Sequence, residues 1–233
     1  MVPRHRPTVP LKGHPCVSHS GSYARVAPRT SGRLGAHLEH SVVVGDRPGA
    51  QVDPRSMPKT ADGLRDAWAI VERTWRSTFS HARQLPEPLV HKNVNGEWSF
   101  VETQRHLLFA TDVWVRRSIL DEPGAWHRLG MPPDHRTGQP APGGDVRQWG
   151  IDVWATPSLE EVLDVRDDYM DLMRDVVDDL TPDRLDQASA HNPPWIPSAT
   201  DIPMSTCVAV VIREEWEHHG FATRDLAVLE KQV

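Results

Sequence analysis

The sequence predicts an all-α protein, a four-helix bundle of the up-down-up-down type with long connecting loops and an N-terminal extension. Four long segments between residues 60 and 230 carry apolar residues at spacings of three and four, the pattern of a helix with one buried face. No stretch alternates with period two for long enough to indicate a strand. Residues 1–57 lack both patterns, and we expect them to be a disordered basic extension preceding a bundle domain at residues 58–233.

The first two helices are predicted from their apolar faces and their ends. The first covers about residues 60–84 and stops before Pro86, because proline lacks the amide hydrogen that a helix interior needs. The second begins at Ser99, whose hydroxyl forms a capping box with Glu102, and continues to about residue 122. Their apolar faces contain Leu64, Ala67, Trp68, Val71, Trp75, Phe79 and Ala82 in the first helix, and Val101, Leu107, Phe109, Ala110, Val113 and Leu120 in the second.

The third and fourth helices have similar signals. Ser158 and Glu161 form a second capping box, and the third helix continues from there to Leu180. Pro182 fits the first position of a short additional turn. The fourth helix is expected to start near Ser205, with Val208, Val211, Ile212, Ala222, Leu226 and Leu229 on its buried face.

Two long connections, residues 122–157 and 181–203, separate these helices. Long loops in a compact domain often form lids or pocket walls. The alternative is that they cover the ends of the bundle and are anchored there by Trp126, Trp149 and Trp195.

The fourth helix places charged residues where its buried face should be apolar. Between Ile212 and Ala222 the apolar stripe falls on Glu215 and His219, which are four residues apart and therefore project from the same side of a helix. A buried charge is costly unless it is paired or binds a metal. His106, in the middle of the second helix among apolar residues, is the best candidate for a third ligand.

The sequence therefore predicts a metal site formed by His106, Glu215 and His219. Such a set binds zinc or another divalent first-row metal and leaves coordination positions open for water or substrate. The pair Glu214 and His218 has the same spacing and is the alternative register. A further alternative is that the whole run is an exposed helix face with i,i+4 ion pairs.

Charge and composition limit the functional classes. Residues 1–56 contain eight Lys or Arg and three Asp or Glu, a net charge of +5, which leaves −11 for residues 57–233 of the total of −6. An acidic folded part argues against nucleic-acid binding, although a basic arm that contacts nucleic acid is an alternative for the extension. No apolar run is long enough for a membrane span, and the two cysteines suggest no disulfide, so we expect a cytoplasmic protein. An alternative for the extension is that translation of the natural protein starts at Met57.

Two segments, GEWSFVETQRHLLFATDVW (96–114) and REEWEHHGFATRDL (213–226), give the chain a resemblance to a known family. Together with the four predicted helices they resemble the DinB-like superfamily of metal-binding bundles, which is similar to thiol-dependent transferases and to mycothiol-dependent maleylpyruvate isomerase. The family pattern is one histidine on the second helix and a pair four residues apart on the fourth. By this resemblance His106 matches the first ligand and His219 the last, and Glu215 stands where many members have histidine.

The resemblance implies metal-assisted chemistry on a small-molecule substrate. A divalent ion would activate a water or a low-molecular-weight thiol, as in a thiol transferase or isomerase. The alternative is a bundle that binds a metal or ligand without catalysis, for example as a stress-response protein. A homodimer formed through helix faces is also expected.

Overall fold

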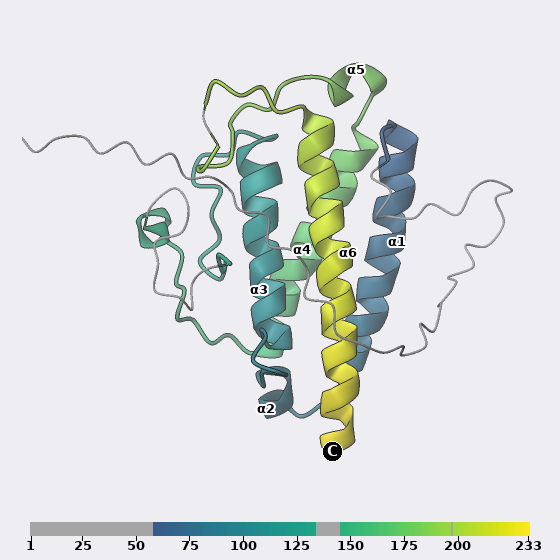
Figure 1. The fold of residues 1–233 in the computed structure, drawn as a ribbon, viewed down its shortest axis with the longest axis vertical. Coiled ribbons are helices and arrows are strands. Elements are labelled where there is room, and N and C mark those ends of the chain that lie inside the picture. The colour runs from purple at the N-terminus through teal and green to yellow at the C-terminus, as the bar shows by residue number, and fades with distance from the viewer. Residues whose placement is uncertain (1–57, 134–144, 197) are drawn as a thin grey trace, which may run out of the picture. The chain divides into compact units, whose positions relative to one another are not determined.

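The chain folds as an all-helical bundle, as predicted (Figure 1). The computed structural model describes residues 58–133, 145–196 and 198–233, so the predicted extension at residues 1–57 lies outside the described residues. The four long helices are α1 (Ala61–Ala82), α3 (Phe100–Thr111), α4 (Leu159–Asp178) and α6 (Met204–Leu229). The short helices α2 (Glu87–Val90) and α5 (Pro182–Leu185) lie in the connections.

The directions of the helices differ from the expected up-down-up-down order. α1 and α3 each pack against both α4 and α6. Arg83, directly after α1, pairs with Glu160 at the start of α4. Arg65, near the start of α1, donates to the carbonyl of Asp178 at the end of α4, so α1 and α4 are antiparallel. α3 also begins at the end of the bundle where α1 stops, so α3 and α4 run parallel (Figure 1). The chain between them, residues 118–158, is long enough to return along the whole bundle, and a bundle with such a crossover can place consecutive helices parallel.

The helix starts and the core follow the sequence patterns. Both capping boxes are present, with the hydroxyl of Ser99 accepting from the amide of Glu102 at 3.2 Å and the hydroxyl of Ser158 accepting from that of Glu161 at 3.3 Å. The four long helices share one apolar core, in which Cys207 is buried as a free cysteine. The largest fully buried side chains include Trp68, Trp75, Phe79, Leu64, Leu107, Leu108, Leu163, Met173 and Ile212.

The second long helix changes its geometry before it ends. Regular α-helical hydrogen bonding stops at Thr111, and a π-helical segment, Asp112–Arg117, follows. This segment buries the side chain of Asp112. Its carboxylate accepts hydrogen bonds from the Tyr169 hydroxyl at 2.6 Å and from the amide of His127 at 2.8 Å. π-Helical turns are rare and are frequent at functional sites.

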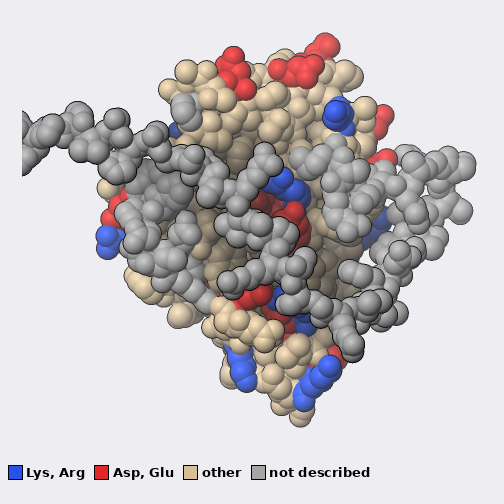
Figure 2. Space-filling view, in the orientation of Figure 1, with Lys and Arg blue, Asp and Glu red and all other residues tan. Residues whose placement is uncertain are grey.

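The surface of the described part is acidic at one end of the bundle. Carboxylates gather over the end formed by α5, where Asp179, Asp183 and Asp186 are exposed (Figure 2). Among the described residues, the helices are all too short or too polar to cross a bilayer.

Candidate metal site

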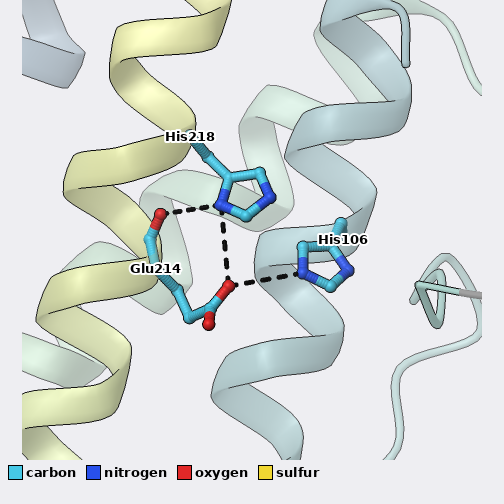
Figure 3. A group of neighbouring side chains, drawn as sticks. All are labelled: His106, Glu214 and His218. Carbon is cyan, nitrogen blue, oxygen red and sulfur yellow. Dashed lines mark hydrogen bonds and ion pairs between the residues drawn. The ribbon is translucent and has the colours of Figure 1, made fainter. Parts of the chain in front are cut away.

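Three potential metal ligands come together between α3 and α6 (Figure 3). His106 projects from the middle of α3, and Glu214 and His218 project from adjacent turns of α6. One ligand atom from each of the three residues lies within 4.8 Å of those of the other two. Because α3 and α6 pack along their lengths, the i,i+4 pair on one helix faces the single histidine on the other.

The distance between His106 and Glu214 fits a shared cation better than a direct hydrogen bond. His106 Nε2 lies 3.6 Å from Glu214 Oε2. This is too long for a hydrogen bond. Metal–ligand bonds of about 2.0–2.2 Å would separate the ligand atoms of a tetrahedral site by roughly 3.4 Å. Two imidazoles and one carboxylate are also a donor set that zinc and similar first-row ions accept.

The ring of His106 is held in the orientation that a ligand needs. Its Nδ1–H donates to the carbonyl oxygen of Met131 at 3.1 Å, which leaves the lone pair of Nε2 directed toward Glu214. Metal-binding histidines commonly use their second nitrogen in this way. Arg105 fixes the same loop by donating to the carbonyl of Leu129 at 2.9 Å, and the amide of Met131 donates back to the carbonyl of Arg105.

The protonation states also suit metal binding. In its protonated form, the His106 imidazole holds the pKa of the Glu214 carboxyl below its ordinary value, against the effect of burial. Burial lowers the pKa of His218, and the neighbouring His106 adds to this effect. Near neutral pH the site therefore contains an ionised carboxylate and a neutral His218, which are the forms that bind cations. The Nδ1–H of His218 donates to the carbonyl of Glu214 at 2.9 Å, so its lone pair is on Nε2.

Aromatic side chains and a cavity adjoin the two histidines. The ring of Trp98 lies 4.6 Å from that of His106 and 5.9 Å from that of His218, measured between centroids. A cavity of about 350 Å³ opens beside His218, within the size range of small-molecule pockets. Its lining includes Glu97, Trp98, Thr103, His218, Phe221 and Asp225. The guanidinium of Arg224 pairs with both Glu97 and Asp225 and lies over the ring of Phe221.

The structure does not bring Glu215 and His219, the ligands favoured by the sequence, into this group. Glu215 is fully buried and pairs with Arg166 of α4 at 2.7 Å, and burial raises the pKa of its carboxyl while Arg166 opposes that rise. The Nε2–H of His219 donates to the Thr78 hydroxyl of α1 at 2.9 Å, and its ring lies 5.0 Å from that of Trp75. The grouped ligand atoms are thus those of the alternative register, with His106 common to both.

Sequence reasoning missed two groups that lie next to the site or its helices. Arg166 lies on the apolar stripe of α4 between Leu163 and Met170, so its position could have revealed a buried cation opposite Glu215. The carbonyl of Met131 belongs to a loop without periodic pattern and carries no side-chain signal.

The fold and this site define a four-helix protein with a candidate His/Glu/His metal centre. A family model for the DinB superfamily matches residues 70–222. The chain belongs to the DinB superfamily, which confirms the resemblance seen in the sequence. No curated protein sequence and no solved structure matches the chain.

Proposed function

We propose that this protein is a divalent-metal-dependent enzyme that acts on a small molecule at the site formed by His106, Glu214 and His218. The observation that carries the proposal is the convergence of two imidazoles and a carboxylate at ligand spacing next to an open cavity. The three side chains would hold zinc or a similar ion. When bound, such an ion lowers the pKa of a water or a low-molecular-weight thiol and so supplies a nucleophile at neutral pH.

The residues of the chain would prepare and enclose this reaction. Met131 keeps His106 in the tautomer that presents Nε2. Trp98 covers the two imidazole rings and limits the access of water from one side. The cavity beside His218 would place a small substrate next to the activated group, with the Trp98 and Phe221 rings as apolar walls. A thiol transferase or isomerase reaction fits this arrangement.

The first test measures metal binding. We expect the untagged protein, dialysed against Zn²⁺ and then against metal-free buffer, to retain about one equivalent by elemental analysis. Glu214→Gln and His106→Ala should lose it, because each removes a ligand. A wild-type protein that retains no divalent metal after this treatment would contradict the proposal.

The second test separates an enzyme from a protein that only binds. Metal-loaded protein is incubated with low-molecular-weight thiols and a panel of electrophiles, and thiol consumption is followed against the His106→Ala variant. We expect consumption that depends on the metal and on His106. Metal binding without turnover of any pair would favour the non-catalytic alternative.

A further inference from the structure

A single arginine side chain lies in the interior of the bundle, on the core side of the candidate metal site. Arg166 of α4 is completely buried. Its Nη2 donates to Glu215 Oε2 of α6 at 2.7 Å, and its Nε donates to Gln104 Oε1 of α3 at 3.1 Å. The same group lies 5.8 Å from the ring of Trp75 in α1. One side chain of α4 therefore contacts all three of the other long helices.

The two acceptors of Arg166 are sequence neighbours of the candidate ligands. Gln104 precedes His106 by two residues on α3, and Glu215 directly follows Glu214 on α6. Arg166 thus joins the two ligand-bearing helices at the level of the site, from the core, while the ligands lie nearer the surface.

We propose that Arg166 is a positioning residue of the metal site. By bridging Gln104 and Glu215 it sets the separation of α3 and α6 and the rotation of α6, and so brings His106 within reach of Glu214 and His218. Metal sites require their ligands to be held within about 0.5 Å and 10–20° of the working geometry. This inference rests on the proposed metal site and adds to it the group that fixes its ligand geometry.

The cost of this arrangement supports a role beyond packing. Replacing a buried ion pair by apolar residues of similar volume is often neutral or stabilising. The arrangement also leaves a buried polar atom unpaired, since Gln104 Nε2 has no hydrogen-bond partner among the described residues. A buried unpaired group lowers the stability of the fold. Methionine or leucine at positions 166 and 215 would satisfy the packing at lower cost.

Glu215 also has an electrostatic role. It lies directly next to Glu214 in the sequence and pairs with the fully buried Arg166 at 2.7 Å. An uncompensated guanidinium would repel a bound divalent cation, and the carboxylate of Glu215 neutralises it within the core.

The test uses a variant that removes both charges together. Arg166→Met combined with Glu215→Met leaves no unpaired ion, so we expect its unfolding midpoint in urea to remain close to that of the wild type. If Arg166 positions the ligands, the affinity for Zn²⁺, measured by competition with a chromophoric chelator, falls about 10- to 100-fold. The visible absorption spectrum of the Co²⁺-loaded variant should change as well, because it reports ligand geometry.

A milder variant and a matched control accompany it. Gln104→Met breaks only the α3 end of the bridge and should lower Zn²⁺ affinity about tenfold. Thr78→Val in α1 removes a partly buried hydrogen bond to His219, which lies on α6 like Glu214 and His218, and should leave Zn²⁺ affinity unchanged.

The outcomes separate the two proposals. Wild-type Zn²⁺ affinity and an unchanged Co²⁺ spectrum in a stable double variant would show that Arg166 is structural only, while the metal site stands. If the double variant does not fold, wild-type affinity in Gln104→Met overturns the inference, and a loss there that Thr78→Val does not share supports it. Absence of metal binding in the wild type overturns the proposed function, and the inference with it.

Discussion

Glu214 and Glu215 are adjacent in the sequence and lie in opposite electrostatic environments. Glu214 is partly exposed, and contact with His106 lowers the pKa of its carboxyl. Glu215 is fully buried, and burial raises the pKa of its carboxyl. A step of one residue turns a helix by about 100°, so the carboxylate of Glu214 faces His106 of α3 while that of Glu215 faces the core. This difference in environment suits the first to bind a cation and the second to hold the bundle together.

The two neighbouring histidines of α6 give a direct test at the residue scale. We predict that His218→Ala lowers Zn²⁺ affinity at least 100-fold, because it removes a ligand. His219→Ala should leave Zn²⁺ affinity within about twofold of the wild type and should reduce stability by about 1 kcal/mol through the lost bond to Thr78. Isothermal titration with Zn²⁺ measures both affinities. The opposite ranking would restore the register that the sequence favoured.

Asp112 predicts a dependence of stability on pH. Burial raises the pKa of its carboxyl from 3.8 to about 6. The folded state therefore binds this proton more tightly than the unfolded state does. The stabilisation of the fold by protonated Asp112 is fully present below pH 3.8 and is lost as the pH rises through about 6. The difference corresponds to about 3 kcal/mol.

Urea unfolding of the wild type and of Asp112→Asn at pH 4.5 and pH 7 measures this contribution. Asparagine cannot ionise, so the variant should lack the part of the pH dependence that Asp112 causes. The free-energy difference between wild type and variant should therefore shift between the two pH values, to the disadvantage of the wild type at pH 7. A constant difference would contradict the prediction.

The helices themselves were largely predictable from local signals. The starts of α3 and α4 follow from the capping serines Ser99 and Ser158, and the predicted ends of α1 and α6 lie close to the observed ones. The short turn after Thr181 is α5. α2 was not predicted, because Pro86 and Pro88 were interpreted only as helix terminators, whereas proline is also compatible with a first helical turn.

The candidate site was predictable only in part. The position of His106 followed from a histidine in an apolar helix, but the choice between two carboxylates on α6 did not. The apolar stripe identifies buried residues, and Glu215 is indeed buried. A buried carboxylate can be neutralised by a metal or by a cation such as Arg166, and the stripe does not distinguish between them. The π-helical segment depends on tertiary contacts of Asp112 and has no periodic signal.

The cap of α3 gives a prediction at the scale of one element. Ser99 is buried, and both bonds of its capping box are present. Ser99→Ala should lower the free energy of unfolding by about 1 kcal/mol, because an amide at the start of the helix loses its acceptor. Chemical denaturation measures the loss, and Ser158→Ala, which removes the equivalent cap of α4, serves as the matched comparison. No change in either variant would contradict the assignment.

For the whole molecule, metal binding and folding are linked. A ligand that binds only the folded state stabilises it by about 2.7 kcal/mol at a free concentration of 100 times its dissociation constant. We therefore predict that Zn²⁺ raises the midpoint of thermal unfolding and that a chelator lowers it again, as measured by circular dichroism. Glu214→Gln should show no such response to either addition. The cytoplasmic location, the homodimer and the absence of nucleic-acid binding stay predictions.

The parallel course of α3 and α4 has a consequence for the order in which the molecule assembles. His106 and Glu214 are separated by more than 100 residues, and the long crossover and all of α4 lie between them. Contacts between such distant segments form late, because the intervening chain must first lose its conformational freedom. A metal ion would then find a complete site only in a chain that has already folded. A bound ion should therefore slow unfolding and leave the rate of folding unchanged. It would add kinetic stability to the folded bundle.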